Sequence, residues 1–118
     1  MAFENDAQLP PELPREDRYV LHNFYRLLNR AEKLRHRWYL ARRRGDLRVA
    51  EMYADWLGLD LADPAVEAPG AEVEHLRRAA ARLRQDLPGR VVIVHCPQCK
   101  AIARTPRARL CPDCGHKW

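Results

Sequence analysis

Four cysteines near the C-terminal end of the chain have the spacing of metal ligands. Cys96 and Cys99 form one C-x2-C pair, and Cys111 and Cys114 form a second pair. Two cysteines three residues apart in a tight turn direct both sulfurs at one ion, and a second such turn completes a tetrahedron with Zn–S distances of about 2.3 Å. The sequence therefore predicts one metal site with four thiolate ligands.

The residues next to the cysteines favour tight turns. Pro97 and Pro112 fix the backbone after the leading cysteine of each pair. Gly115 follows the second pair and adopts a positive φ at little cost, which such turns often need. Lys100 holds the corresponding place after the first pair, where a positive φ costs about 1 kcal/mol. We expect the metal site to form despite this cost.

Residues 91–118 resemble the zinc-ribbon group, whose rubredoxin-like knuckles have the form C-P-x-C and C-P-x-C-G. The resemblance implies a β-hairpin module that holds one Zn²⁺ through the four cysteines. It covers only about a quarter of the chain, and no family is recognised for residues 1–89. The motif is specific for a metal but not for a function, because zinc ribbons serve in transcription, translation, enzymes and protein contacts.

Two other uses of the cysteines remain open. Iron binds the same tetrathiolate, and rubrerythrin-like proteins join such a module to a helical di-iron domain. Only one Glu-x-x-His pair is present, from Glu72 to His75, so iron is the less favoured metal. Disulfides would suit a secreted domain, but paired C-x2-C is ligand spacing. Four sulfurs close the coordination sphere, so we expect a structural metal, with His95 and His116 outside it.

Composition argues against an enzyme. The chain has no serine and a single threonine, Thr105, and its five glycines are scattered singly, so serine-hydrolase chemistry and a glycine-rich phosphate loop are excluded. No small-molecule substrate is evident. Apolar runs such as Val91 to Val94 are four residues long, so no membrane span is expected. The acidic, proline-rich N-terminus does not have the pattern of a secretory signal, and we expect a cytoplasmic protein.

Hydrophobic periodicity predicts three helices ahead of the cysteines. The first contains a stripe at helical spacing, formed by Val20, Phe24, Leu27, Ala31, Leu34, Trp38 and Ala41. The second is expected at about residues 47–59, with a broad apolar surface that suggests packing on more than one side. The third is expected at about 71–87 and ends at Pro88-Gly89. No internal repeat is recognised.

These elements predict an α+β protein with three parts. Residues 1–16 form a flexible segment, residues 17–89 a helical bundle of about three helices, and residues 90–118 a small β-hairpin zinc ribbon. We expect the helical stripes to form a shared intramolecular seam. The alternative is a helix-mediated dimer, because three heptads approach the length that a coiled coil needs.

Charge is unevenly distributed along the chain. Residues 18–48 carry ten Lys or Arg against two Asp or Glu, whereas residues 49–76 carry seven acidic residues and no Lys or Arg. The two blocks either face each other inside one fold or leave a basic surface for nucleic acid. The candidate nucleic-acid contacts are Lys100, Arg104, Arg107 and Arg109 in the ribbon, and Arg42, Arg43 and Arg44 in the first helix.

Two functions follow from these features. The first is a zinc-binding accessory protein that contacts nucleic acid, or the transcription or translation machinery, through the basic ribbon and the arginine-rich helix. The second is a protein-interaction adaptor that docks a partner along the helical seam, with a purely structural zinc ribbon. An acidic protein surface is the alternative partner for the ribbon's arginines.

Overall fold

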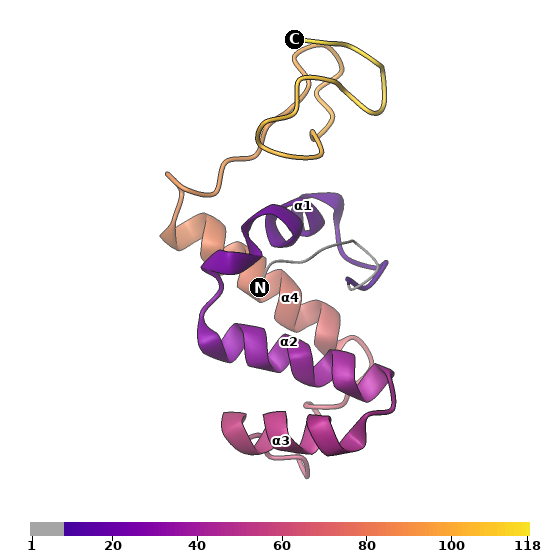
Figure 1. Ribbon diagram of the computed structural model, residues 1–118, viewed down its shortest axis with the longest axis vertical. Coiled ribbons are helices and arrows are strands. Elements are labelled where there is room, and N and C mark those ends of the chain that lie inside the picture. The colour runs from indigo at the N-terminus through magenta and orange to yellow at the C-terminus, as the bar shows by residue number, and fades with distance from the viewer. Residues whose placement is uncertain (1–8) are drawn as a thin grey trace.

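The computed structural model describes residues 9–118 and is helical. It contains α1 (Arg15–Phe24), the short 3-10 helix η2 (Tyr25–Leu27), α2 (Arg30–Arg43), α3 (Leu47–Leu57) and α4 (Ala71–Asp86). The molecule is elongated, with extents of 50 × 27 × 24 Å. Figure 1 shows residues 90–118 at one end, next to α1, and α3 at the opposite end. None of the helices in this described part combines the length and apolarity that crossing a membrane requires.

The continuous first helix predicted from the apolar stripe is wrong. The chain leaves the helix at Leu28, whose ψ of 145° is extended, and starts again at Asn29. A capping box causes the new start: Glu32 N donates to Asn29 Oδ1 at 2.8 Å, and Asn29 N donates to Glu32 Oε1 at 2.9 Å. The break splits the stripe, because Phe24 lies in one hydrophobic cluster and Trp38 in another.

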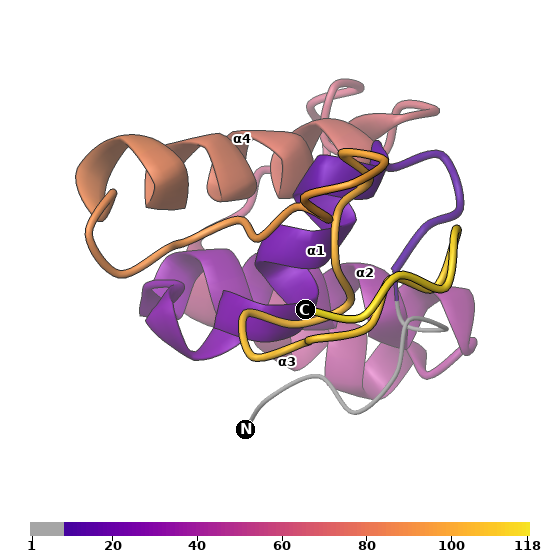
Figure 2. The same cartoon turned by 90° about the horizontal axis from the view of Figure 1, so that it is seen from above.

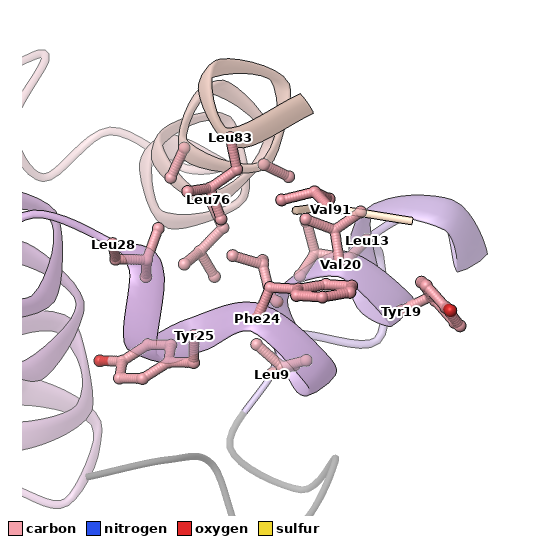
Figure 3. Packing of buried hydrophobic residues seen from close by; sticks show 13 residues of the cluster. Leu9, Leu13, Tyr19, Val20, Phe24, Tyr25, Leu28, Leu76, Leu83 and Val91 are labelled. Atoms are coloured by element: carbon pink, nitrogen blue, oxygen red, sulfur yellow. The ribbon is translucent and has the colours of Figure 1, made fainter. Parts of the chain in front are cut away.

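The larger cluster lies between α1, η2 and α4. Leu76 and Leu83 of α4 face Val20 and Phe24 of α1, and Val91 closes the cluster from the chain after α4 (Figure 3). The cluster is completed by two residues of the predicted flexible segment, Leu9 and Leu13, which are 3% and 5% exposed. Leu9 and Leu13 therefore fix residues 9–14 on the core, although Pro11, Glu12 and Pro14 are exposed. Residues 1–8 of that segment lie outside the described part of the chain.

The smaller cluster joins α2 to α3. Trp38 and Ala41 of α2 pack against Ala50 and Ala54 of α3. Asp46 caps α3 by accepting from Val49 N at 3.3 Å, and the observed bounds of α3 and α4 confirm the predicted helices to within two residues.

Only one side of α3 is packed, contrary to the prediction. Its outer side carries Leu47 and Trp56, which are 67% and 57% exposed. The apolar surface is as broad as predicted, but the cluster with α2 covers Ala50 and Ala54 fully and Val49, Tyr53 and Leu57 only in part.

The predicted β-hairpin at the C-terminus is not supported. In the described chain, residues 90–118 form only two isolated antiparallel bridges, His95 to Ile102 and Leu110 to Lys117. Each bridge pairs the two sides of one cysteine turn, so the paired segments are too short to extend into a ladder. We call residues 90–118 the cysteine module.

Ion pairs join the basic and acidic blocks of the helical part. Arg42 pairs with Glu67, and Arg43 pairs with Glu72 at 3.3 Å. Two of the ten basic residues of residues 18–48 are thus paired with the acidic block. A separate ion pair joins Arg82 of α4, which belongs to neither block, to both carboxylate oxygens of Glu32 at 2.6 Å.

Candidate metal centre

The four cysteine sulfurs converge at one point of the module. Cys96 Sγ lies 3.7 Å from Cys114 Sγ, and Cys99 Sγ lies 3.5 Å from Cys111 Sγ. All four sulfurs lie within 4.8 Å of one another. A regular tetrahedron with Zn–S distances of about 2.3 Å has S–S edges of about 3.8 Å, so the cluster can hold one metal ion. The distances are far longer than the about 2.05 Å of a disulfide, and all four thiols are free.

Two equivalent turns, fifteen residues apart, build the site. In the first turn, Cys96 N donates to Ala101 O at 2.8 Å, and Lys100 N donates to Cys96 O at 2.9 Å. The second turn repeats these bonds from Cys111 N to His116 O at 2.8 Å and from Gly115 N to Cys111 O at 3.0 Å. This backbone repeat was missed in the sequence, because the two turns share little beyond C-P-x-C.

The backbone angles confirm the prediction for Gly115, which has a φ of 77°. Lys100 adopts nearly the same conformation, with a φ of 67°, and is the described chain's one non-glycine residue with positive φ. Its side chain turns back, and Nζ donates to Pro97 O at 3.1 Å. Lys100 therefore adopts a strained left-handed conformation, which lets both cysteines of the first turn reach the same point.

Backbone N–H groups favour the thiolate form at two of the four sulfurs, those of Cys96 and Cys111. At Cys99 and Cys114 a backbone hydrogen bond lowers the pKa, but hydrogen bonds with neighbouring sulfurs and burial outweigh it and raise the pKa. Cys114 N and Asp113 N each donate to Cys111 Sγ at 3.4 Å, and together they lower the pKa of Cys111 to about 7. Burial opposes the charged form of Cys96, but hydrogen bonds from the N–H groups of Cys99 and Gln98 outweigh it and lower that pKa too. The lowered pKa values of Cys96 and Cys111 favour metal binding at these two ligands, because a thiol must lose its proton to become a ligand.

The site is half-buried. Cys96 and Cys111 are buried, whereas Cys99 and Cys114 are exposed. The ring of His116 stacks on Trp118, with ring centroids 6.2 Å apart and an interplanar angle of 14°. Four sulfurs complete a tetrahedron and leave no position for a substrate.

Helix α1 anchors the cysteine module through hydrogen bonds that sequence analysis missed. Arg15 Nη2 donates to Ile102 O at 3.2 Å, and Arg15 Nη1 pairs with Asp113 Oδ2 at 2.9 Å. Asn23 Nδ2 donates to Arg104 O at 3.0 Å. The contacts span 81 to 98 residues of sequence, and no local motif indicates such distant partners.

Tyr19 is a further anchor on the same helix. Its ring belongs to the larger cluster, while its hydroxyl turns outward (Figure 3), donates to Val92 O at 2.8 Å and accepts from Val94 N at 3.3 Å. The hydroxyl thus binds the strand-like segment that leads into the first cysteine turn.

The predicted basic contact residues separate into two groups. The guanidinium groups of Arg104, Arg107 and Arg109 are on the exposed loop between the two turns, and they form no ion pair within residues 9–118. Arg42 and Arg43, at the end of α2, pair with acidic residues instead. In Figure 1, α1 lies between the module and α2, so the structure does not bring the two groups together.

No protein family, no curated protein and no solved structure matches this chain.

Proposed function

We propose that this protein is a zinc-binding accessory protein that contacts nucleic acid through its cysteine module. One observation carries the proposal: a cluster of four converging sulfurs flanks a loop whose three arginines have no acidic partner in the described chain. The metal fixes the loop, and the arginines meet phosphate groups.

Zinc is the ion that suits the site best. A tetrahedral set of four thiolates is typical of zinc and of iron, and structural zinc sites in small modules commonly use it. The module contributes few buried side chains of its own beyond Val91, Cys96, Ala103 and Cys111. Metal binding would therefore supply much of the free energy that folds it.

The charge of the module favours a polyanion. It carries six Lys or Arg and one acidic residue, Asp113, which Arg15 of α1 already neutralises. A Zn²⁺ ion with four thiolates contributes about −2, so a net positive charge of about 3 remains. Such a surface attracts phosphates and releases their counterions.

The proposed role is binding rather than catalysis. A closed tetrathiolate offers no open coordination position, and no nucleophile and base are placed together at it. The adaptor function predicted for the helical seam has less support, because Leu34, Trp38 and Ala41 of that seam are all buried.

Metal analysis and a salt titration test the proposal. Purified, reduced protein should contain one zinc per chain. Its affinity for a fluorescein-labelled single-stranded oligonucleotide, measured by anisotropy, should fall steeply with salt. The double variant Arg107→Ala with Arg109→Ala should bind about tenfold more weakly and reduce the salt slope by about two.

A matched double variant controls for charge. Arg30→Ala with Arg48→Ala removes two exposed arginines of the helical part and should change the affinity less than twofold. Absence of metal, or absence of salt-dependent binding to both RNA and DNA, would contradict the proposed function.

A further inference from the structure

A groove of about 560 Å³ lies between α1 and the cysteine module. Figure 2, viewed from above, shows the module lying across α1. The polar groups of the groove come from both sides: Arg15, Arg18 and His22 from α1, and Arg104, Thr105 and Asp113 from the module. Its volume is in the range of small-ligand pockets and exceeds what a single phosphate group needs.

The groove carries an excess of positive charge. Asp113 is its acidic side chain, and the ion pair with Arg15 at 2.9 Å neutralises it. Arg18 donates to a neutral acceptor, Pro10 O, at 2.7 Å and so retains its full charge. Arg104 has no ion pair within the described residues. Two guanidinium charges therefore remain uncompensated across the groove.

Two other grooves of the molecule differ in this respect. The groove beside Pro10 is lined by Glu12, Glu72 and Glu74 against Arg43 and Arg77. The groove over Trp38 balances two arginines with two glutamates. The groove between α1 and the module is thus the one of the three with a net positive charge.

Hydrogen bonds and an ion pair fix the two walls of the groove, α1 and the cysteine module, relative to each other. Asn23 of α1 binds the carbonyl of Arg104, which fixes the backbone beside that arginine. Arg15 binds Ile102 O and the carboxylate of Asp113, which lies between the two cysteines of the second turn. The position of the module wall therefore depends on the metal site.

We infer that this groove binds a phosphate group of the nucleic-acid backbone, held between Arg18 and Arg104 with the hydroxyl of Thr105 as a further donor. Guanidinium groups bind phosphate with paired N–H donors, and threonine hydroxyls are common phosphate contacts. This inference rests on the proposed function and extends it, because it assigns contacts to α1, outside the module.

Single substitutions from each wall test the inference. Arg18→Gln and Arg104→Gln should each weaken binding of a labelled single-stranded 12-mer about five- to tenfold and lower the salt slope by about one. Arg48→Gln, an exposed arginine of α3 with the same change in charge, is the control and should alter affinity less than twofold. Because Arg104 is exposed, its substitution should leave the fold intact, as circular dichroism will check.

The outcomes separate this inference from the proposed function. If the Arg107 and Arg109 double variant loses affinity while Arg18→Gln and Arg104→Gln bind normally, the groove inference is wrong and the proposed function stands. If no oligonucleotide binds, both fail. A titration with inorganic phosphate identifies the source of the ligand. Changes in the amide chemical shifts of Arg18 and Thr105 at millimolar phosphate, in a protein that binds no oligonucleotide, would assign the groove to a small phosphate compound. That result would overturn the inference.

Discussion

At the scale of single residues, Glu32 joins the start of α2 to α4. Its carboxylate caps α2 through Asn29 N and accepts two hydrogen bonds from Arg82 of α4. Its backbone carbonyl lies 3.2 Å from His75 Nε2. Burial alone would raise the pKa of the Glu32 carboxyl, but the bonds from Arg82 and Asn29 outweigh burial and hold it below 4.5. The charged form therefore stabilises the fold.

Glu32→Gln should lower the free energy of unfolding at pH 7 by about 2 kcal/mol, because hydrogen bonds to a charged group are lost. A lowered pKa contributes stability above about pH 4.5 and loses it as the pH falls through the folded-state pKa. Urea denaturation at pH 7 and pH 3 should therefore show a difference between variant and wild type that shrinks in acid.

Glu74→Gln is the matched control for this carboxylate. Glu74 pairs with Arg78 one turn away on the surface of α4, so its loss should cost less than about 0.5 kcal/mol. A Glu32 effect no larger than that of Glu74, or one that does not depend on pH, would contradict the role given to Glu32.

The positive-φ residues of the two cysteine turns, Lys100 and Gly115, offer a second test at this scale. Lys100→Gly should strengthen metal binding about fivefold, because glycine adopts the left-handed conformation without the cost of about 1 kcal/mol. Gly115→Ala should weaken binding by a similar factor. A Cβ at Gly115 meets no atom within 4 Å, so the backbone conformation alone sets this cost. Competition with a coloured chelator measures the metal affinity of each variant. Equal affinities in the wild type, Lys100→Gly and Gly115→Ala would exclude strain at these turns.

At the scale of elements, the sequence predicts the metal site better than it predicts the helices. The site depends on spacings of three residues and on proline and glycine beside them, so its geometry is local. The prediction of one continuous first helix was wrong because apolar residues at helical spacing continue through the break at Leu28 and Asn29. Only the Asn29-x-x-Glu32 pattern signals a new helix start there. The docking of α1 on the module could not be predicted, since its contacts join distant segments.

The variant Asn29→Ala tests whether the capping box causes the helix break at Leu28 and Asn29. Loss of the capping box should cost about 1 kcal/mol in chemical denaturation. Asp46→Ala removes the single capping bond of α3 and should cost less, because that bond is longer, at 3.3 Å, and has no reciprocal partner. A rise in stability and helix content in Asn29→Ala would mean that the cap alone prevents one continuous helix.

At the scale of the whole molecule, the core and the metal site are stacked end to end. Val91 belongs to the larger cluster, and Ile93 and Ile102 pack against it from the cysteine module. The helical residues of this cluster do not need the module to meet each other, since α1 and α4 contact directly (Figure 3). A metal ion held by the four cysteines would therefore support the helical domain at one end only.

Removing the metal should lower the thermal midpoint without unfolding the helices at 25 °C. Loss of the partly buried Ile93 and Ile102 contacts would cost about 1 to 2 kcal/mol, which corresponds to a fall of about 5 to 15 °C for a domain of this size. Far-UV circular dichroism with and without EDTA measures both quantities. Cys99→Ser, which lacks one exposed ligand, should melt like the chelated protein and should not respond to EDTA. Collapse of the helical signal on chelation at 25 °C would show instead that the module holds the whole fold together.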